Sequence, residues 1–185
     1  MKVLLILLIF IFNFFLIGCT QKEENVEALT EEDLVVSETA AGDFILRLVS
    51  KNAVYEAGEP ITIVGKLKYR GNKEELVITY ANSPFTFDII ESTRGVEIPF
   101  AVRSTFRNTI LEYDQWYEEE YDKQALPNDN NDKTAVFMSS YIKEEGFPPG
   151  EYEVEVRSEF MINTGQTKED HSYTTSILLD VKELN

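Results

Sequence analysis

The sequence feature that most constrains the fold is an alternation of apolar and polar residues with a period of two, which begins after Gly42. Successive side chains of a β-strand point to opposite faces, so this period predicts strands that bury one face. The pattern covers residues 44–48, 61–69, 85–89, 152–156 and 177–181. Residues 76–81 and 133–142 are two further predicted strands. We expect no amphipathic helix longer than about three turns.

Turn-forming residues separate the predicted strands at intervals of about ten residues. The turns fall at residues 70–72, 82–84, 93–95, 148–150 and 163–165. Short strands with regular spacing are typical of a β-sandwich, and the lack of alternating strands and helices argues against a parallel sheet. We therefore predict one all-β domain over residues 43–185, built as an antiparallel β-sandwich.

The N-terminus has the pattern of an export signal. Lys2 precedes an apolar run of about 15 residues, fewer than the roughly 20 that a membrane-spanning helix needs. The run ends in Leu16-Ile17-Gly18-Cys19, which resembles the lipobox of bacterial lipoproteins. The resemblance implies a signal peptide over residues 1–18 and a diacylglycerol on the thiol of Cys19, whose two acyl chains form a stable anchor.

The alternative for this segment is an uncleaved N-terminal helix with an unmodified cysteine. Both alternatives place the rest of the chain outside the cytoplasm, because the basic residue precedes the apolar run and the acidic segment follows it. We therefore expect an extracytoplasmic protein that is lipid-anchored to the outer face of the bacterial cell membrane.

Residues 20–42 are strongly acidic and have no sustained apolar period, which is typical of a disordered segment. We predict that residues 19–42 form a lipid-anchored acidic linker. The whole chain has 33 acidic and 17 basic residues and a formal net charge of −16. This charge argues against nucleic acid, since phosphate binding needs clustered Lys and Arg, and favours a basic protein or peptide as partner.

The residues needed for common catalytic chemistry are scarce. Cys19 is the only cysteine, so the folded domain has no disulfide, thiolate nucleophile or cysteine metal site. The only histidine, His171, is expected on a loop before the last strand, and no common nucleophile, zinc or phosphate-binding motif occurs. We predict no enzyme, no cofactor and no metal; a hydrolase or cation-binding protein built from surface carboxylates is the last alternative.

The polar segment 127–132 contains Asp129 and Asp132, whose carboxylates are ligands that Ca²⁺ prefers. The segment lacks the spacing and the glycine of an EF-hand. We favour a loop of turn-forming residues, with a calcium site as the alternative.

The most unusual segment, residues 112–122, combines acidic and aromatic residues. Tyr113, Tyr117 and Tyr121 recur every four residues, so a short helix would place them on one side, with Trp116 adjacent. Aromatic side chains surrounded by acids would form an interface hot spot for a basic partner. The favoured alternative is the apolar underside of a helix or loop that caps one end of the sandwich, because large aromatic side chains tend to be buried.

The stretch from Tyr55 to Ile63, with the sequence YEAGEPITI, resembles the opening of immunoglobulin-like domains of Gram-positive secreted proteins. It also resembles the BsuPI-type proteinase inhibitor family. Segments 76–81, 85–95 and 149–154 match in the same order. The resemblance implies an immunoglobulin-like fold and the inhibition of subtilisin-like serine proteases.

The predicted function is that of a membrane-anchored lipoprotein whose non-catalytic sandwich binds a protein or peptide through its loops. Protease inhibition is the alternative. In that case an extended loop over residues 92–108 or 143–150 would enter the protease cleft as a substrate mimic.

Overall fold

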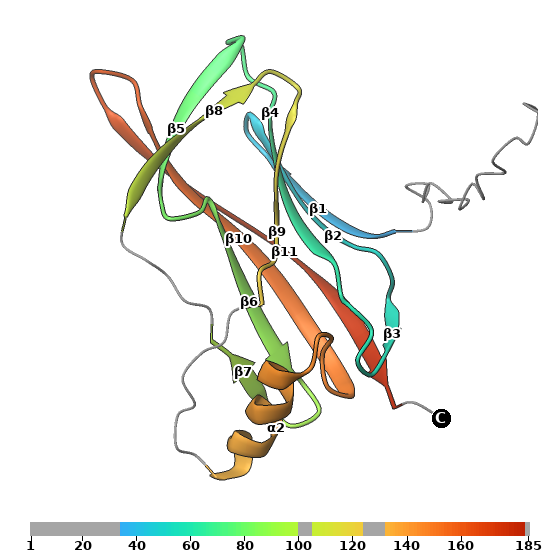
Figure 1. Cartoon of the computed structure of the whole chain (residues 1–185). Coiled ribbons are helices and arrows are strands. Elements are labelled where there is room, and N and C mark those ends of the chain that lie inside the picture. Colours follow the sequence, from blue (N-terminus) through green and yellow to red (C-terminus); the bar gives the residue numbers. More distant parts are fainter. Residues whose placement is uncertain (1–33, 100–104, 124–131, 184–185) are drawn as a thin grey trace, which may run out of the picture.

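The structure, a computed structural model, describes residues 34–99, 105–123 and 132–183. Figure 1 shows two β-sheets packed face to face, with a helix at one end. In chain order the elements are β1 (Val35–Ala41), β2 (Phe44–Ser50), β3 (Val54–Glu56), β4 (Ile63–Tyr69), β5 (Glu75–Ala81), β6 (Phe85–Glu91), β7 (Val96–Ile98), β8 (Phe106–Glu112), β9 (Trp116–Glu120), α2 (Asp132–Lys143), β10 (Gly150–Asn163) and β11 (Lys168–Lys182).

The first sheet has four strands in the order β1-β2-β4-β9, and all its pairings are antiparallel. Strand β4 shows the predicted alternation along its whole length: Ile63, Gly65, Leu67 and Tyr69 are buried, and the residues between them are half-buried. Gly65 leaves room for the aromatic rings of the opposite sheet, because a Cβ atom there would lie 3.2 Å from both Phe85 and Phe87.

The second sheet has the strand order β3-β11-β10-β5-β8. Strand β6 also pairs with β10, over residues 152–158, whereas β5 pairs with β10 only where Thr79 meets Met161. Strands β5 and β6 therefore share one edge of the long strand β10. The chain passes from one to the other through Asn82, which has a φ of 63°.

The expectation of an all-β sandwich is confirmed. The sheet that contains β2, β4 and β9 packs against the sheet that contains β5, β10 and β11. One pairing departs from the antiparallel expectation, because β3 runs parallel to β11. The most deeply buried large apolar and aromatic side chains are Leu46, Leu48, Tyr55, Ile63, Leu67, Ile78, Phe85, Ile89, Leu111, Tyr141 and Tyr152, and Glu91 is buried with them.

The two ends of the sandwich differ (Figure 1). At the hairpin end, the β1–β2 turn at Gly42 lies near the β10–β11 turn at Gly165. At the helix end, α2 packs beside β6, β7 and the start of β10. The described chain enters β1 at Val35, opposite Ser50, and thus at the other end of this sheet from Gly42.

Strand β1 overturns part of the predicted linker over residues 19–42. It pairs with β2 from end to end, and the two-residue turn Gly42-Asp43 joins the strands. Gly42 has a φ of 57°, and glycine at the first position of a two-residue hairpin loop adopts this conformation without strain. The prediction of disorder is therefore wrong for residues 35–41, and residues 19–33 lie outside the described part of the chain.

Polar contacts explain why β1 has no apolar period. Its inward-facing side chains include Ser37 and Thr39, which reach across to β11. The hydroxyls of Ser37 and Thr175 lie 2.7 Å apart, and the hydroxyl of Thr39 donates to the carbonyl of Thr174 at 2.8 Å. A strand held in this way buries little apolar surface, so its residues resemble those of a polar linker.

Residues 133–142 do not form the predicted strand, because they lie within helix α2. Its inner face carries Phe137, Met138 and Tyr141, whose spacing of one, three and four residues is that of a helix. Within residues 34–99, 105–123 and 132–183, no helix is long and apolar enough to cross a bilayer.

Candidate functional site

The most exposed cluster of apolar side chains lies on the outer face of the second sheet, at the hairpin end. Phe106 and Ile110 on β8 are 69% and 56% exposed, and Val77 on β5 is 53% exposed. Half-buried Ala81 and Met161 complete the cluster, since Ala81 pairs with Phe106 and Met161 lies opposite Thr79. We call these five residues the β8 face.

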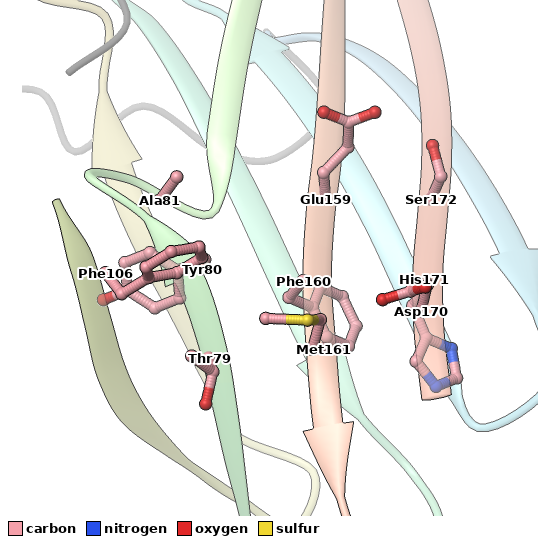
Figure 2. A pocket seen from close by; sticks show the side chains of 10 residues that line it. All are labelled: Thr79, Tyr80, Ala81, Phe106, Glu159, Phe160, Met161, Asp170, His171 and Ser172. Atoms are coloured by element: carbon pink, nitrogen blue, oxygen red, sulfur yellow. The ribbon is translucent and has the colours of Figure 1, made fainter. Parts of the chain in front are cut away.

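A shallow hollow of about 360 Å³ borders the β8 face. Figure 2 shows Phe106, Ala81 and Met161 around it, with Glu159 and Asp170 on the neighbouring strands β10 and β11. Both acidic side chains are exposed. The hollow therefore has an apolar floor and an acidic border.

Sequence reasoning missed the β8 face. Phe106 lies in the segment 92–108, which the inhibitor alternative treats as an extended loop, and Val77 lies in the predicted strand 76–81. The one signal was the alternation of Phe106, Asn108 and Ile110 with Arg107 and Thr109. Two apolar residues on an outer face are a weak pattern, because a buried face is normally what makes such an alternation visible.

The four predicted aromatic site residues do not form one surface. Tyr113 lies after β8 and is half exposed, Trp116 and Tyr117 lie on β9, and Tyr121 follows β9. Residues 112–122 contain the end of β8, a turn at Asp114 and strand β9, so the expectation of a helix is wrong. Adjacent residues of a strand point to opposite faces, and Trp116 and Tyr117 therefore point away from each other.

Tyr117 and Tyr121 point into the sandwich. Tyr117 stacks on Phe85 with ring centroids 6.1 Å apart and donates a hydrogen bond of 2.5 Å to Glu119. Burial, together with this hydrogen bond, raises the pKa of Tyr117 above its ordinary value. The hydroxyl of Tyr121 lies 2.7 Å from that of Tyr141, and burial raises the pKa of Tyr121 as well. Both phenols therefore contribute to the core rather than to a docking surface.

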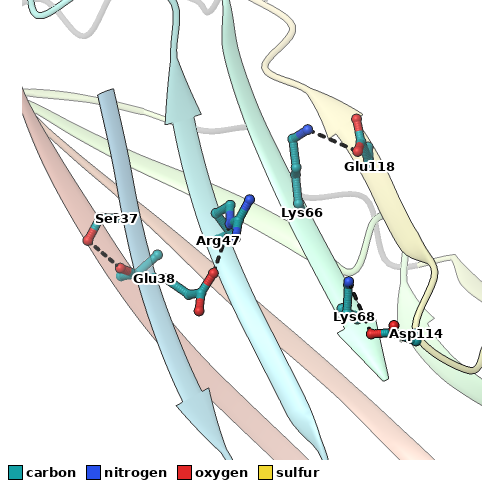
Figure 3. A network of polar contacts seen from close by, with 8 residues as sticks. Ser37, Glu38, Arg47, Lys66, Lys68, Asp114 and Glu118 are labelled. Atoms are coloured by element: carbon teal, nitrogen blue, oxygen red, sulfur yellow. Dashed lines mark hydrogen bonds and ion pairs between the residues drawn. The ribbon is translucent and has the colours of Figure 1, made fainter. Parts of the chain in front are cut away.

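Trp116 points outward, onto the outer face of the first sheet. The guanidinium of Arg47 and the ammonium of Lys68 each lie 4.6 Å from its ring centroid. The cations of this face are matched by acids, as Figure 3 shows. The ion pairs are Arg47 with Glu38 at 2.8 Å, Lys66 with Glu118 at 2.9 Å and Lys68 with Asp114 at 3.1 Å. This face is therefore internally neutralised.

His171 lies in strand β11 rather than on the expected loop. Its ring stacks on Phe160 with centroids 5.1 Å apart, and Nδ1 lies 3.0 Å from the hydroxyl of Tyr173. The other ring nitrogen, Nε2, lies 4.0 Å from Glu169 and has no hydrogen-bond partner among the described residues. The ring of Phe44 also lies 5.3 Å from the histidine ring, so this side chain sits mainly among aromatic residues, and no hydrogen bond joins it to a serine or threonine in the described part of the chain.

The segment 143–150 begins with the last residue of α2, and its central residues pack against the helix end. Phe147 is buried, and its ring lies 5.0 Å from that of Tyr152. The ammonium of Lys123 donates to the carbonyls of Glu144 and Gly146 at 2.8 and 2.5 Å. Burial lowers the pKa of this lysine. Residues 146–148 are buried and residues 143–145 are exposed, and the role of this segment as an inhibitory loop stays a prediction.

The other predicted inhibitory segment, residues 92–108, is divided in the structure. It contains a turn, strand β7 and the start of β8, and residues 100–104 lie outside the described part of the chain.

Two predicted sites fall largely outside the described residues. Cys19 and Asp129 are not described, and Asp132 is the first residue of α2. Within the part of the chain that the structure describes, no three His, Cys, Asp or Glu residues are arranged to hold a metal ion. The lipid anchor and the calcium alternative therefore stay predictions.

Comparisons with known proteins give little information about this chain. No protein-family model matches it, and no curated protein matches it in sequence. Among solved structures, a protein from Archaeoglobus fulgidus is similar over 82% of this chain and 97% of its own, with 10% sequence identity and a TM-score of 0.35. We draw no inference about fold or function from a similarity of this size.

Proposed function

We propose that the protein is an extracytoplasmic lipoprotein, anchored through Cys19, whose β-sandwich binds a protein or peptide without catalysing a reaction. The observation that carries the binding function is the β8 face. Exposed apolar side chains that gather on one face of a sheet often mark an interaction site. In the β8 face the polar pair Thr79 and Asn108 lies between Phe106 and Ile110. Other strongly exposed apolar residues, such as Val136 and Leu178, lie on α2 and β11 and do not belong to this cluster.

The position of the N-terminal strand fits this proposal. The described chain enters β1 at the end of the first sheet away from Gly42, whereas the β8 face lies at the hairpin end. An anchor that precedes β1 would therefore be attached at the end of the sandwich opposite the hairpin end. The β8 face would then lie in the half of the sandwich that is more distant from the membrane, where a partner can reach it.

The anchor is tested by changing its attachment point. We expect the wild-type protein, purified from a bacterium that exports it, to begin at Cys19 and to carry the mass of a diacylglycerol. Cys19→Ser should keep its N-terminus uncut at Gly18 and should carry no lipid. Intact-mass spectrometry and membrane fractionation measure both results. A wild-type protein that keeps Met1 and lacks lipid would overturn the anchor but not the binding function.

The binding surface is tested by placing charge on it. The double variant Phe106→Glu, Ile110→Glu should recover about tenfold less, or even less, of the specific partners that the wild-type protein recovers. The reason is that a few apolar side chains buried in an interface supply most of its binding energy. Cross-linking at the surface of the native cell, followed by quantitative mass spectrometry, measures this loss.

Leu178→Glu is the matched control, since it changes an exposed leucine elsewhere on the same sheet. Thermal melts should be equal for the two variants. If the double variant retains the same partners as Leu178→Glu, the β8 face is not the binding surface.

A further inference from the structure

Strand β8 is an open edge of the second sheet. It pairs with β5 over its whole length, from Glu112 opposite Glu75 to Phe106 opposite Ala81. Among the described residues, no strand pairs with its other side. The backbone groups of such an edge form a template for another extended chain.

The pairing with β5 determines which residues turn their backbone toward this open side. The amide of Asn82 donates to the carbonyl of Thr105 at 2.7 Å, and the amide of Tyr113 donates to the carbonyl of Glu74 at 2.8 Å. Hydrogen-bonded pairs alternate along an antiparallel ladder, so odd-numbered residues of β8 bond to β5. The amide and carbonyl groups of Phe106, Asn108 and Ile110 and the amide of Glu112 therefore point to the open side. The carbonyl of Glu112 accepts a hydrogen bond of 3.3 Å from the amide of Gln115, so the free edge ends at this residue.

The side chains of the same residues lie on the outer face of the sheet. Phe106 is beside Ala81, Asn108 is beside Thr79, and both partners belong to the outer face. An added strand would therefore place every second side chain in line with Phe106, Asn108, Ile110 and Glu112. The outer side chains of the partner would meet, in order, an aromatic, an amide, an aliphatic and an acidic group.

The charges along this line favour a basic partner. Glu112 is exposed at the end of the edge, and Glu75 lies directly behind it on β5. Neither carboxylate forms an ion pair with a described residue that would neutralise it. The cation of β8, Arg107, lies on the opposite face of the strand. A lysine or arginine of the partner would thus meet two unpaired acids about one strand spacing apart, roughly 5 Å.

We propose that β8 binds an extended segment of a partner protein as an additional strand, with apolar side chains beside Phe106 and Ile110 and a basic side chain beside Glu112. This inference rests on the proposed function and specifies the chemistry of the partner. Backbone hydrogen bonds would supply affinity, and the apolar and basic positions would supply specificity.

The test uses two synthetic peptides and the soluble protein from residue 20 onward, which retains all the described residues. The first peptide, Lys-Thr-Val-Thr-Thr-Thr-Val-Thr-Lys, presents Val and Lys on one face in either chain direction. The second has Glu in place of both Lys residues. Fluorescence anisotropy of labelled peptides measures the dissociation constants. We expect the Lys peptide to bind at least about tenfold more tightly than the Glu peptide at low salt.

Two substitutions test the mode of binding. Asn108→Pro removes an amide that points to the open side and spares the hydrogen bonds to β5, so it should weaken binding about tenfold. Asn108→Ala is its control, because both variants lose the 2.7 Å hydrogen bond from Thr79 to the Asn108 side chain. Glu112→Lys should reduce or reverse the preference for the Lys peptide.

Each contrary outcome identifies the step that is wrong. Equal binding by Asn108→Pro and Asn108→Ala overturns strand addition. Equal binding of both peptides by the wild-type protein overturns the proposal that the partner is basic. The proposed binding function is tested separately, by the cross-linking experiment. A protein dimer that Asn108→Pro abolishes, with no peptide bound, assigns the edge to a second copy of the chain and overturns the proposal.

Discussion

Replacing Tyr141 by alanine is expected to lower the free energy of unfolding by about 3–5 kcal/mol, the usual range for a buried aromatic residue. Tyr141 is 1% exposed and joins α2 to the sandwich. Its ring lies 6.2 Å from that of Phe137 and 5.2 Å from that of Phe147. Its hydroxyl meets that of Tyr121. Burial raises the pKa of Tyr141, so its phenol stays protonated at neutral pH.

Chemical denaturation measures this effect against a control on the same helix. Val136 is 75% exposed, so Val136→Ala should change the free energy of unfolding by less than about 0.5 kcal/mol. Tyr141→Phe should cost about 1 kcal/mol, because it removes only the hydroxyl pair. If Tyr141→Ala is no more destabilising than Val136→Ala, α2 is not a structural cap of the helix end.

Replacing Glu91 by alanine is expected to cost about 2–4 kcal/mol. The side chain of Glu91 is 0% exposed and accepts hydrogen bonds from the amides of Thr93 and Arg94 at 3.0 and 2.8 Å. A hydrogen bond to a charged group contributes about 1.5–3 kcal/mol. The guanidinium of Arg94 lies 3.3 Å from Glu91 and donates to the carbonyl of Pro149 at 2.9 Å. Glu91 therefore ties the β6–β7 turn to the start of β10.

The control for this change is Glu153→Ala, which removes an exposed glutamate from the neighbouring strand β10. Its free energy of unfolding should stay within about 0.5 kcal/mol of that of the wild-type protein. Equal stability of the two variants in urea denaturation would show that the Glu91 hydrogen bonds contribute no net stability.

The parts of the fold that the sequence predicts are those whose buried side chains are apolar. Strand β4 is the clearest case, because Ile63, Leu67 and Tyr69 all point into the core. Strand β1 escaped prediction because its inward contacts are hydroxyl groups, and helix α2 because only Phe137, Met138 and Tyr141 carry its period. Periodicity reports apolar burial, so it cannot detect an element that is held by polar contacts or by a few large rings.

The aromatic segment shows how one spacing can fit two structures. Tyr117 and Tyr121 are four residues apart, and such residues share a face in a helix and in a strand, while Tyr113 lies before the turn that precedes β9. Trp116 is the residue that distinguishes the two, since it would lie beside Tyr113 on a helix but points away from Tyr117 on a strand. The choice of strand depends on pairing with β4, a long-range contact that a local pattern does not contain.

The open side of β8 also affects the tendency of the protein to aggregate. An uncovered strand with exposed Phe106 and Ile110 can join copies of the chain edge to edge, which is the first step of β-aggregation. A formal net charge of −16 opposes that encounter by mutual repulsion between copies, while it attracts basic polypeptides. The negative charge of the protein would thus keep copies apart at high local concentration, although the edge of β8 is unpaired among the described residues. The same charge would favour binding of positively charged partners.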